Sequence, residues 1–106
     1  MSYDIWVEMD AGGEEPMTAG DWNYTSNMAP AWRAAGADLG EFHGLKARVC
    51  SPVLRLAIAR MEEDTESYRE YDAQNGWGSM DTLLPALREL ADDLERYPEA
   101  TVKVSR

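Results

Sequence analysis

The most regular pattern in the chain lies in residues 79–98, which read SMDTLLPALRELADDLERYP. Large apolar side chains recur there at alternating intervals of four and three residues, at Leu83, Leu87, Leu90, Leu94 and Tyr97. This spacing places them along one side of an α-helix about 25 Å long. Ser79 or Asp81 is a suitable N-cap, Pro98 ends the helix, and Pro85 fits if the helix begins near residue 81 or 82. The segment predicts a helix with one apolar face.

Strand patterns occur at both ends of the chain. Apolar and polar residues alternate over residues 3–9 and again over residues 101–105, which is the period of a half-buried strand. Residues 10–16 contain two glycines and a proline and predict a turn, after which residues 17–25 can run back as a second strand. These segments predict an N-terminal hairpin and a C-terminal strand.

Shorter helices are predicted between the strands. Ser26 or Asn27 is a natural N-cap for a helix over residues 28–35. The pair Ser51-Pro52 is typical of a second helix start. That helix is expected to bury one apolar face, formed by Val53, Leu54, Ala57, Ile58 and Met61. Asp64 is a suitable N-cap for a third helix, over residues 65–72.

These elements predict one α+β domain over residues 1–106. We expect a small, mostly antiparallel sheet, made of the N-terminal hairpin and the C-terminal strand, covered on one face by three to four helices. No apolar run reaches the roughly 18 residues of a membrane span, and the N-terminus does not resemble a signal peptide. A single cysteine fits a reducing compartment, so we expect a cytoplasmic protein without a membrane partner.

The charge of the chain is strongly negative and unevenly distributed. The formal net charge is −10. Residues 1–30 carry six acidic side chains and no basic one, whereas residues 31–60 carry five basic and two acidic side chains. Such a charge repels nucleic acids and anionic membranes, and it suits docking on a basic protein.

Residue combinations for catalysis or metal binding are mostly missing. His43 and Cys50 are the single histidine and the single cysteine, which leaves no zinc-binding set. A nucleophilic pair would require these two side chains to meet in space, and an isolated cysteine is more commonly a small buried filler. The carboxylate clusters at residues 62–64 and 92–93 are typical of exposed helix faces. We therefore expect no enzyme activity, no metal and no cofactor.

Two distant segments, residues 21–33 and 75–78, combine aromatic rings with amides. The candidate ligand-binding residues are Asn23, Tyr24, Thr25, Asn27, Trp32, Arg33, Asn75 and Trp77. A few polar groups among rings is what a small-ligand pocket requires, and a nucleobase could stack on a tryptophan while Arg33 meets a phosphate. The alternative is structural, with the indoles filling the core and the amides completing turns and a helix cap.

These observations lead to two functional hypotheses. The first is a non-enzymatic protein that holds a nucleotide-like ligand between the two segments and so sequesters a signal. The alternative is an acidic inhibitor, an immunity-type protein or a DNA mimic that docks on a basic protein partner. A homo-oligomer that covers surplus rings such as Trp6 is a third arrangement.

The chain resembles a group of small proteins of undetermined activity from actinobacteria and their phages. The resemblance lies in residues 1–6 (MSYDIW), 23–27 (NYTSN), 32–33 (WR) and 75–78 (NGWG), and it covers most of the chain in the same order. Pro85 departs from the helix-favouring residue expected near the start of the last helix. The resemblance implies a phage or bacterial, cytoplasmic setting, in which proteins of this size often act against host defences or toxins. It implies no catalytic residue.

Overall fold

A computed structural model describes residues 2–10, 12–13, 15, 17–72, 76 and 78–106 of the chain. The strands are β1 (Ser2–Met9), β2 (Met17–Thr25) and β3 (Thr101–Ser105). The helices are α1 (Ala29–Ala34), α2 (Ala47–Glu63), α3 (Thr65–Tyr68) and α4 (Met80–Arg96). Three 3₁₀ turns accompany them, η1 (Ser26–Met28), η2 (Leu39–Phe42) and η3 (Arg69–Tyr71). The predicted α+β fold is confirmed.

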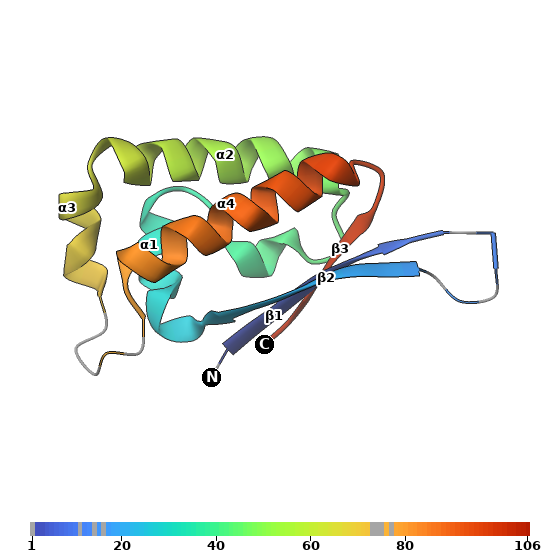
Figure 1. Ribbon diagram of the computed structural model, residues 1–106, viewed down its shortest axis with the longest axis horizontal. Helices are drawn as coiled ribbons and strands as arrows, with labels where there is room; N and C mark the ends of the chain where they lie inside the picture. Colours follow the sequence, from blue (N-terminus) through green and yellow to red (C-terminus); the bar gives the residue numbers. More distant parts are fainter. Residues whose placement is uncertain (1, 11, 14, 16, 73–75, 77) are drawn as a thin grey trace.

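The sheet has the strand order β2-β1-β3, and both pairings are antiparallel. The helices lie on one side of it, the β1–β2 hairpin extends beyond them at one end, and α3 lies at the other end (Figure 1). The register of β1 and β2 shifts between Ile5 and Val7. Gly20 lies opposite this shift with φ +76°, and a Cβ there would lie 2.0 Å from the Trp22 ring. The irregularity therefore requires a glycine at this position.

The free edges of the two outer strands differ. The segment just before α2 covers β3, because Val104 N donates to His43 Nδ1 at 2.9 Å and Val102 N donates to Leu45 O at 2.8 Å. No such pairing covers the outer edge of β2 within the described residues. The β3 edge of the sheet is therefore covered by the chain itself.

The leucine stripe of α4 forms the centre of the core. Its four leucines are all buried, at most 5% exposed, while Tyr97 is half-buried. They pack with the buried face of α2 and with the inward side chains of β1, of which Ile5 and Val7 are at most 1% exposed. Ser79 caps α4 by accepting a hydrogen bond from Thr82 N. The helix starts at Met80, one residue before the predicted range, so Pro85 lies inside it and cannot donate to the carbonyl of Asp81.

The predicted start of α2 at Ser51-Pro52 is wrong, because one continuous helix begins at Ala47 and contains Pro52. The first turn is stabilised from outside the helix. Ala47 N donates to Ala100 O at 2.8 Å, and Arg48 N donates to Pro98 O at 3.0 Å. These tertiary hydrogen bonds satisfy N–H groups that a helix start leaves without partners, which compensates for the bond lost at Pro52.

Two further sequence predictions are corrected, one at a helix start and one on a helix face. Thr25, rather than Ser26 or Asn27, caps the turn before α1, because its Oγ1 accepts a hydrogen bond from Asn27 N. Val53 does not join the buried face of α2, since its side chain is 42% exposed. The helix therefore carries apolar residues on its outer side as well as on its inner side.

Because the leucine stripe lies in the core, truncating one of its side chains should destabilise the fold. Leu90→Ala should lower the free energy of unfolding by about 2–5 kcal/mol, because it removes buried methyl groups and leaves a cavity. Glu89→Ala on the exposed side of the same helix should change it by less than about 0.5 kcal/mol. Urea denaturation followed by circular dichroism measures both values. Equal effects of the two substitutions would contradict this packing.

Candidate functional site

Trp32 lies in the core and not at a surface. Its side chain is 0% exposed. The rings of Tyr3 and Tyr24 meet it edge to face, with centroids 5.2 Å and 6.3 Å away. Its Nε1 is buried and has no hydrogen-bond partner within the described part of the chain. This indole is therefore not offered to a ligand as the stacking surface that the sequence suggested.

The neighbouring predicted residues serve three different parts of the fold. Tyr24 is 4% exposed, and its hydroxyl donates to Ala86 O on α4 at 2.9 Å. Asn23 lies exposed on the strand and donates from Nδ2 to Asp4 Oδ1 at 2.6 Å. Thr25 and Asn27 form the cap of η1 through the hydrogen bond described above. The structure brings only Tyr24 and Trp32 of this set into ring contact.

Arg33 is oriented by the protein itself. Its Nη2 donates to the Tyr3 hydroxyl at 3.0 Å, and its Nε lies 3.5 Å from Asp38 Oδ2. The side chain of Arg33 remains 47% exposed. A carboxylate therefore already partners the guanidinium that was expected to meet a phosphate.

The hollow next to these residues is small. It has a volume of about 140 Å³ and is lined by Asn23, Tyr24, Thr25, Met28, Thr82, Leu83 and Ala86. Pockets for drug-sized ligands usually have about 300–1,000 Å³. The two remaining predicted residues, Asn75 and Trp77, lie outside the described residues. Ligand binding between the two segments stays a prediction, but the buried ring of Trp32 does not line this hollow.

Cys50 and His43 have separate partners. Cys50 is 1% exposed, and its Sγ lies 4.0 Å from Phe42 O. Burial raises the pKa of its thiol to about 11, which opposes formation of the nucleophilic thiolate. The imidazole of His43 accepts its hydrogen bond from β3. Among the described residues there is no group of three or more side chains that could hold a metal ion.

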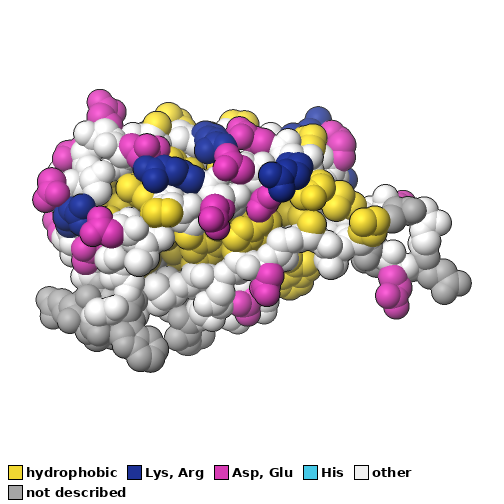
Figure 2. All heavy atoms as spheres, in the orientation of Figure 1, with side chains coloured by type: hydrophobic (Ala, Val, Ile, Leu, Met, Phe, Trp, Pro, Cys, Tyr) yellow, Lys and Arg dark blue, Asp and Glu magenta, His cyan; other side chains and the backbone are white. Residues whose placement is uncertain are grey.

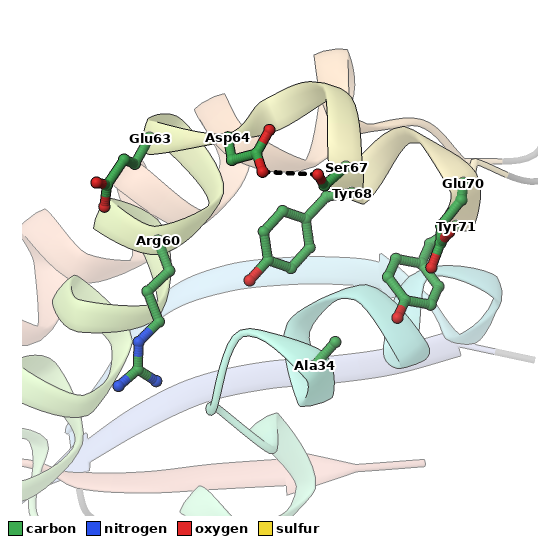
Figure 3. Close-up of a pocket in the computed structure, with 8 residues that line it drawn as sticks. All are labelled: Ala34, Arg60, Glu63, Asp64, Ser67, Tyr68, Glu70 and Tyr71. Atoms are coloured by element: carbon green, nitrogen blue, oxygen red, sulfur yellow. Dashed lines mark hydrogen bonds between the residues drawn. The ribbon is translucent and has the colours of Figure 1, made fainter.

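A larger groove, which the sequence did not predict, lies where α1, α2 and α3 meet. Its volume is about 660 Å³. It is lined by Ala34, Arg60, Glu63, Asp64, Ser67, Tyr68, Glu70 and Tyr71. The rings of Tyr68 and Tyr71 extend from the α3–η3 segment over Ala34 of α1, and Arg60 enters from α2 (Figure 3). The two ring centroids are 6.3 Å apart, and the ring planes are tilted by 42°.

The charges of this groove are mainly negative. Its lining includes three carboxylates, Glu63, Asp64 and Glu70, and one cation, Arg60. The guanidinium of Arg60 is engaged, since its Nη1 donates to Ala35 O at 2.9 Å. Asp64 accepts a hydrogen bond from Ser67 Oγ at 2.6 Å. Glu63 and Glu70 form no ion pair with any other described residue.

The sequence contains a signal for this groove that composition alone does not reveal. Residues 62–72 read EEDTESYREYD, in which two tyrosines are surrounded by acidic residues. The turn at Asp64, between α2 and α3, brings these tyrosines back over α1. Together the groove and its charges can bind a cationic group, because tyrosine faces and carboxylates both attract positive charge.

No protein-family model, no curated protein and no solved structure matches the chain. None of the helices in the described ranges is long and apolar enough to cross a membrane. The structure therefore shows an α+β domain with an acidic, tyrosine-lined groove at one end.

The buried hydroxyl of Tyr24 predicts an alkaline loss of stability. Burial, together with the nearby carboxylates of Glu89 and Asp93, raises the pKa of Tyr24 well above its ordinary value. The unfolded chain therefore releases this proton above about pH 10 while the folded chain retains it, so the free energy of unfolding falls as the pH rises further.

Tyr24→Phe tests this effect. The variant should lose about 1 kcal/mol at neutral pH with the hydrogen bond to Ala86. Between about pH 9 and pH 11 it should lose less stability than the wild type, because it has no proton to release at this position. Urea denaturation at several pH values measures the difference, and two parallel declines would contradict it.

Proposed function

We propose that this protein is a non-enzymatic binding protein that docks on a basic segment of another protein through the groove between α1, α2 and α3. The observation that carries the proposal is the pairing of two tyrosine faces with three carboxylates in one groove. The only cation in its lining, Arg60, is already held by a backbone carbonyl. A lysine or arginine side chain of the partner would lie in the groove, against the tyrosine rings and the carboxylates.

Each contact of a basic side chain in the groove is weak, so binding requires several of them together. A cation over a tyrosine face is worth about 0.5–1 kcal/mol when exposed and about 2 kcal/mol when desolvated. An exposed ion pair adds about 0–1 kcal/mol. Several weak cation–π and ion-pair contacts in one groove therefore add up to selective binding of a basic side chain. The net charge of −10 also accelerates the encounter with a basic surface.

The rest of the surface supports the same partner. Figure 2 shows acidic side chains gathered over the α3 end of the molecule, with basic side chains among them. Arg69, directly after α3, is paired with Glu66 at 2.8 Å and Asp81 at 3.0 Å. The carboxylates around the groove therefore outnumber the cations that could neutralise them.

The nucleotide-like ligand is the second candidate, and one feature of the groove favours it. Two tyrosine rings could stack on a base while Arg60 faces a phosphate. The three carboxylates of the lining would repel that phosphate, so this candidate ranks below the basic partner. In the phage or bacterial cytoplasm that the sequence resemblance implies, we propose that the basic partner is a host defence protein or a toxin.

A labelled peptide of alternating lysine and arginine residues tests the proposal by fluorescence anisotropy. The peptide should bind the wild type, and binding should weaken as the salt concentration rises. Tyr71→Leu, which keeps an apolar side chain and removes the aromatic face, should weaken binding about three- to tenfold.

Two single-charge variants separate groove binding from general attraction. Glu70→Gln removes a carboxylate that lines the groove, whereas Glu89→Gln removes an exposed carboxylate on α4. The first should weaken binding about threefold or more, and the second less than about twofold. Equal effects would show attraction by net charge alone. Binding of adenosine nucleotides that Tyr71→Leu abolishes would favour the second candidate instead.

A further inference from the structure

The outer face of α2 carries an apolar stripe that the fold of one chain leaves uncovered. Three large hydrophobic side chains are exposed along it, Val49 by 51%, Val53 by 42% and Leu56 by 53%, and Leu45, two residues before the helix, is 42% exposed. Met17, on the hairpin, is the only other large hydrophobic residue exposed in the described ranges. In Figure 2 separate patches of hydrophobic side chains lie at the upper edge of the molecule, over α2.

This stripe is not an extension of the core. The opposite side of α2 already supplies the core with Leu54, Ala57, Ile58 and Met61, each at most 2% exposed. A helix at a protein surface normally has a polar outer face. A contiguous apolar surface with a polar rim marks a site of interaction.

The three exposed apolar residues of α2 belong to a heptad pattern that continues into charged residues at both ends, one of which, Arg60, also donates from Nη1 to Ala35 O. The residues of this pattern recur at intervals of three, four, three, four and three residues, at Lys46, Val49, Val53, Leu56, Arg60 and Glu63. This is the spacing of the residues that face a partner helix in a two-helix seam. The seam runs from Lys46, which precedes α2 and donates from Nζ to Glu99 O at 3.0 Å, through an apolar centre, to Glu63 at the end of the helix.

We propose that a second copy of this chain covers the stripe, with the two α2 helices packed antiparallel about a two-fold axis. In the antiparallel orientation the apolar residues of the two helices face each other and unlike charges meet at both ends, whereas a parallel pair would place like charges opposite each other. Val53 of each copy then lies opposite Leu56 of the other, and Val49 lies opposite the aliphatic stem of Arg60. At both ends, Lys46 lies opposite Glu63 of the second copy, where unlike charges attract.

Charge also favours a second copy over a basic partner at this surface. Residues 31–60, which include most of α2, hold five of the ten basic side chains of an otherwise acidic chain. A basic segment would meet like charges here, whereas two acidic copies repel each other least where their basic segments lie. The groove at α3 and the stripe on α2 therefore suit different partners.

The interface is expected to be small. A helix of 17 residues is about 25 Å long, and one pair of such helices buries less area than the roughly 1,200–2,000 Å² of a standard interface. We expect a reversible dimer with a dissociation constant on the order of micromolar. Arg60 and Glu63 line the groove as well as the seam, so in this dimer Asp64 and Glu70 are the carboxylates that the groove does not share with the seam.

Sedimentation equilibrium of the purified chain tests the dimer. The mass should rise from 11.9 kDa towards twice that value with increasing concentration. Leu56→Glu and Val53→Glu should raise the dissociation constant of the dimer at least about tenfold, because each places a carboxylate in the apolar centre. Met17→Glu is the matched control, as it makes the same kind of change on the most exposed of these side chains and should leave the dimer intact.

A charge exchange tests the antiparallel orientation. Lys46→Glu and Glu63→Lys should each weaken the dimer about threefold, since each places like charges at both ends of the seam. The double variant should restore the wild-type affinity. Circular dichroism confirms that every variant is folded. A wild type that stays monomeric at high micromolar concentration, a dimer that Leu56→Glu leaves unchanged, or a double variant without rescue would overturn the proposal.

Discussion

The packing of α4 between α2 and the sheet is the constraint on which the rest of the structure depends. Its leucines reach both layers, so the position of α4 fixes the distance and direction of α2 relative to β1 and β2. The segment that follows α4 also supplies Pro98 O and Ala100 O to the first residues of α2. α4 and the segment after it therefore hold α2 by its side and by its end, and α2 in turn carries one wall of the groove.

The sequence predicts those elements whose patterns are local. The alternation in residues 3–9 and the leucine spacing in α4 each depend on one face of one element, and the structure confirms both. The start of α2 could not be predicted in the same way. Its first N–H groups find acceptors about fifty residues later in the chain, so the proline signal at Ser51-Pro52 was overridden by tertiary contacts.

Candidate functional residues were harder to predict because composition does not tell which way a ring points. Trp32 stands in a short segment rich in alanines, and the small side chains Ala31 and Ala35 are buried beside it. Alanines leave room for an indole in a core, which is a signal that favours the structural alternative. The tyrosine groove needs three segments to converge, so Tyr68 and Tyr71 look like ordinary helix residues in the sequence.

We propose recognition at the acidic, tyrosine-lined groove, whereas the described aromatic and amide residues of β2 and α1 belong mainly to the core and its caps. The most direct test is a titration of isotope-labelled protein with the lysine–arginine peptide, followed by nuclear magnetic resonance. The account predicts that the largest shift changes fall on the amides of Ala34, Arg60, Ser67, Tyr68 and Tyr71. Shift changes spread over the acidic surface, or centred on β2, would contradict it.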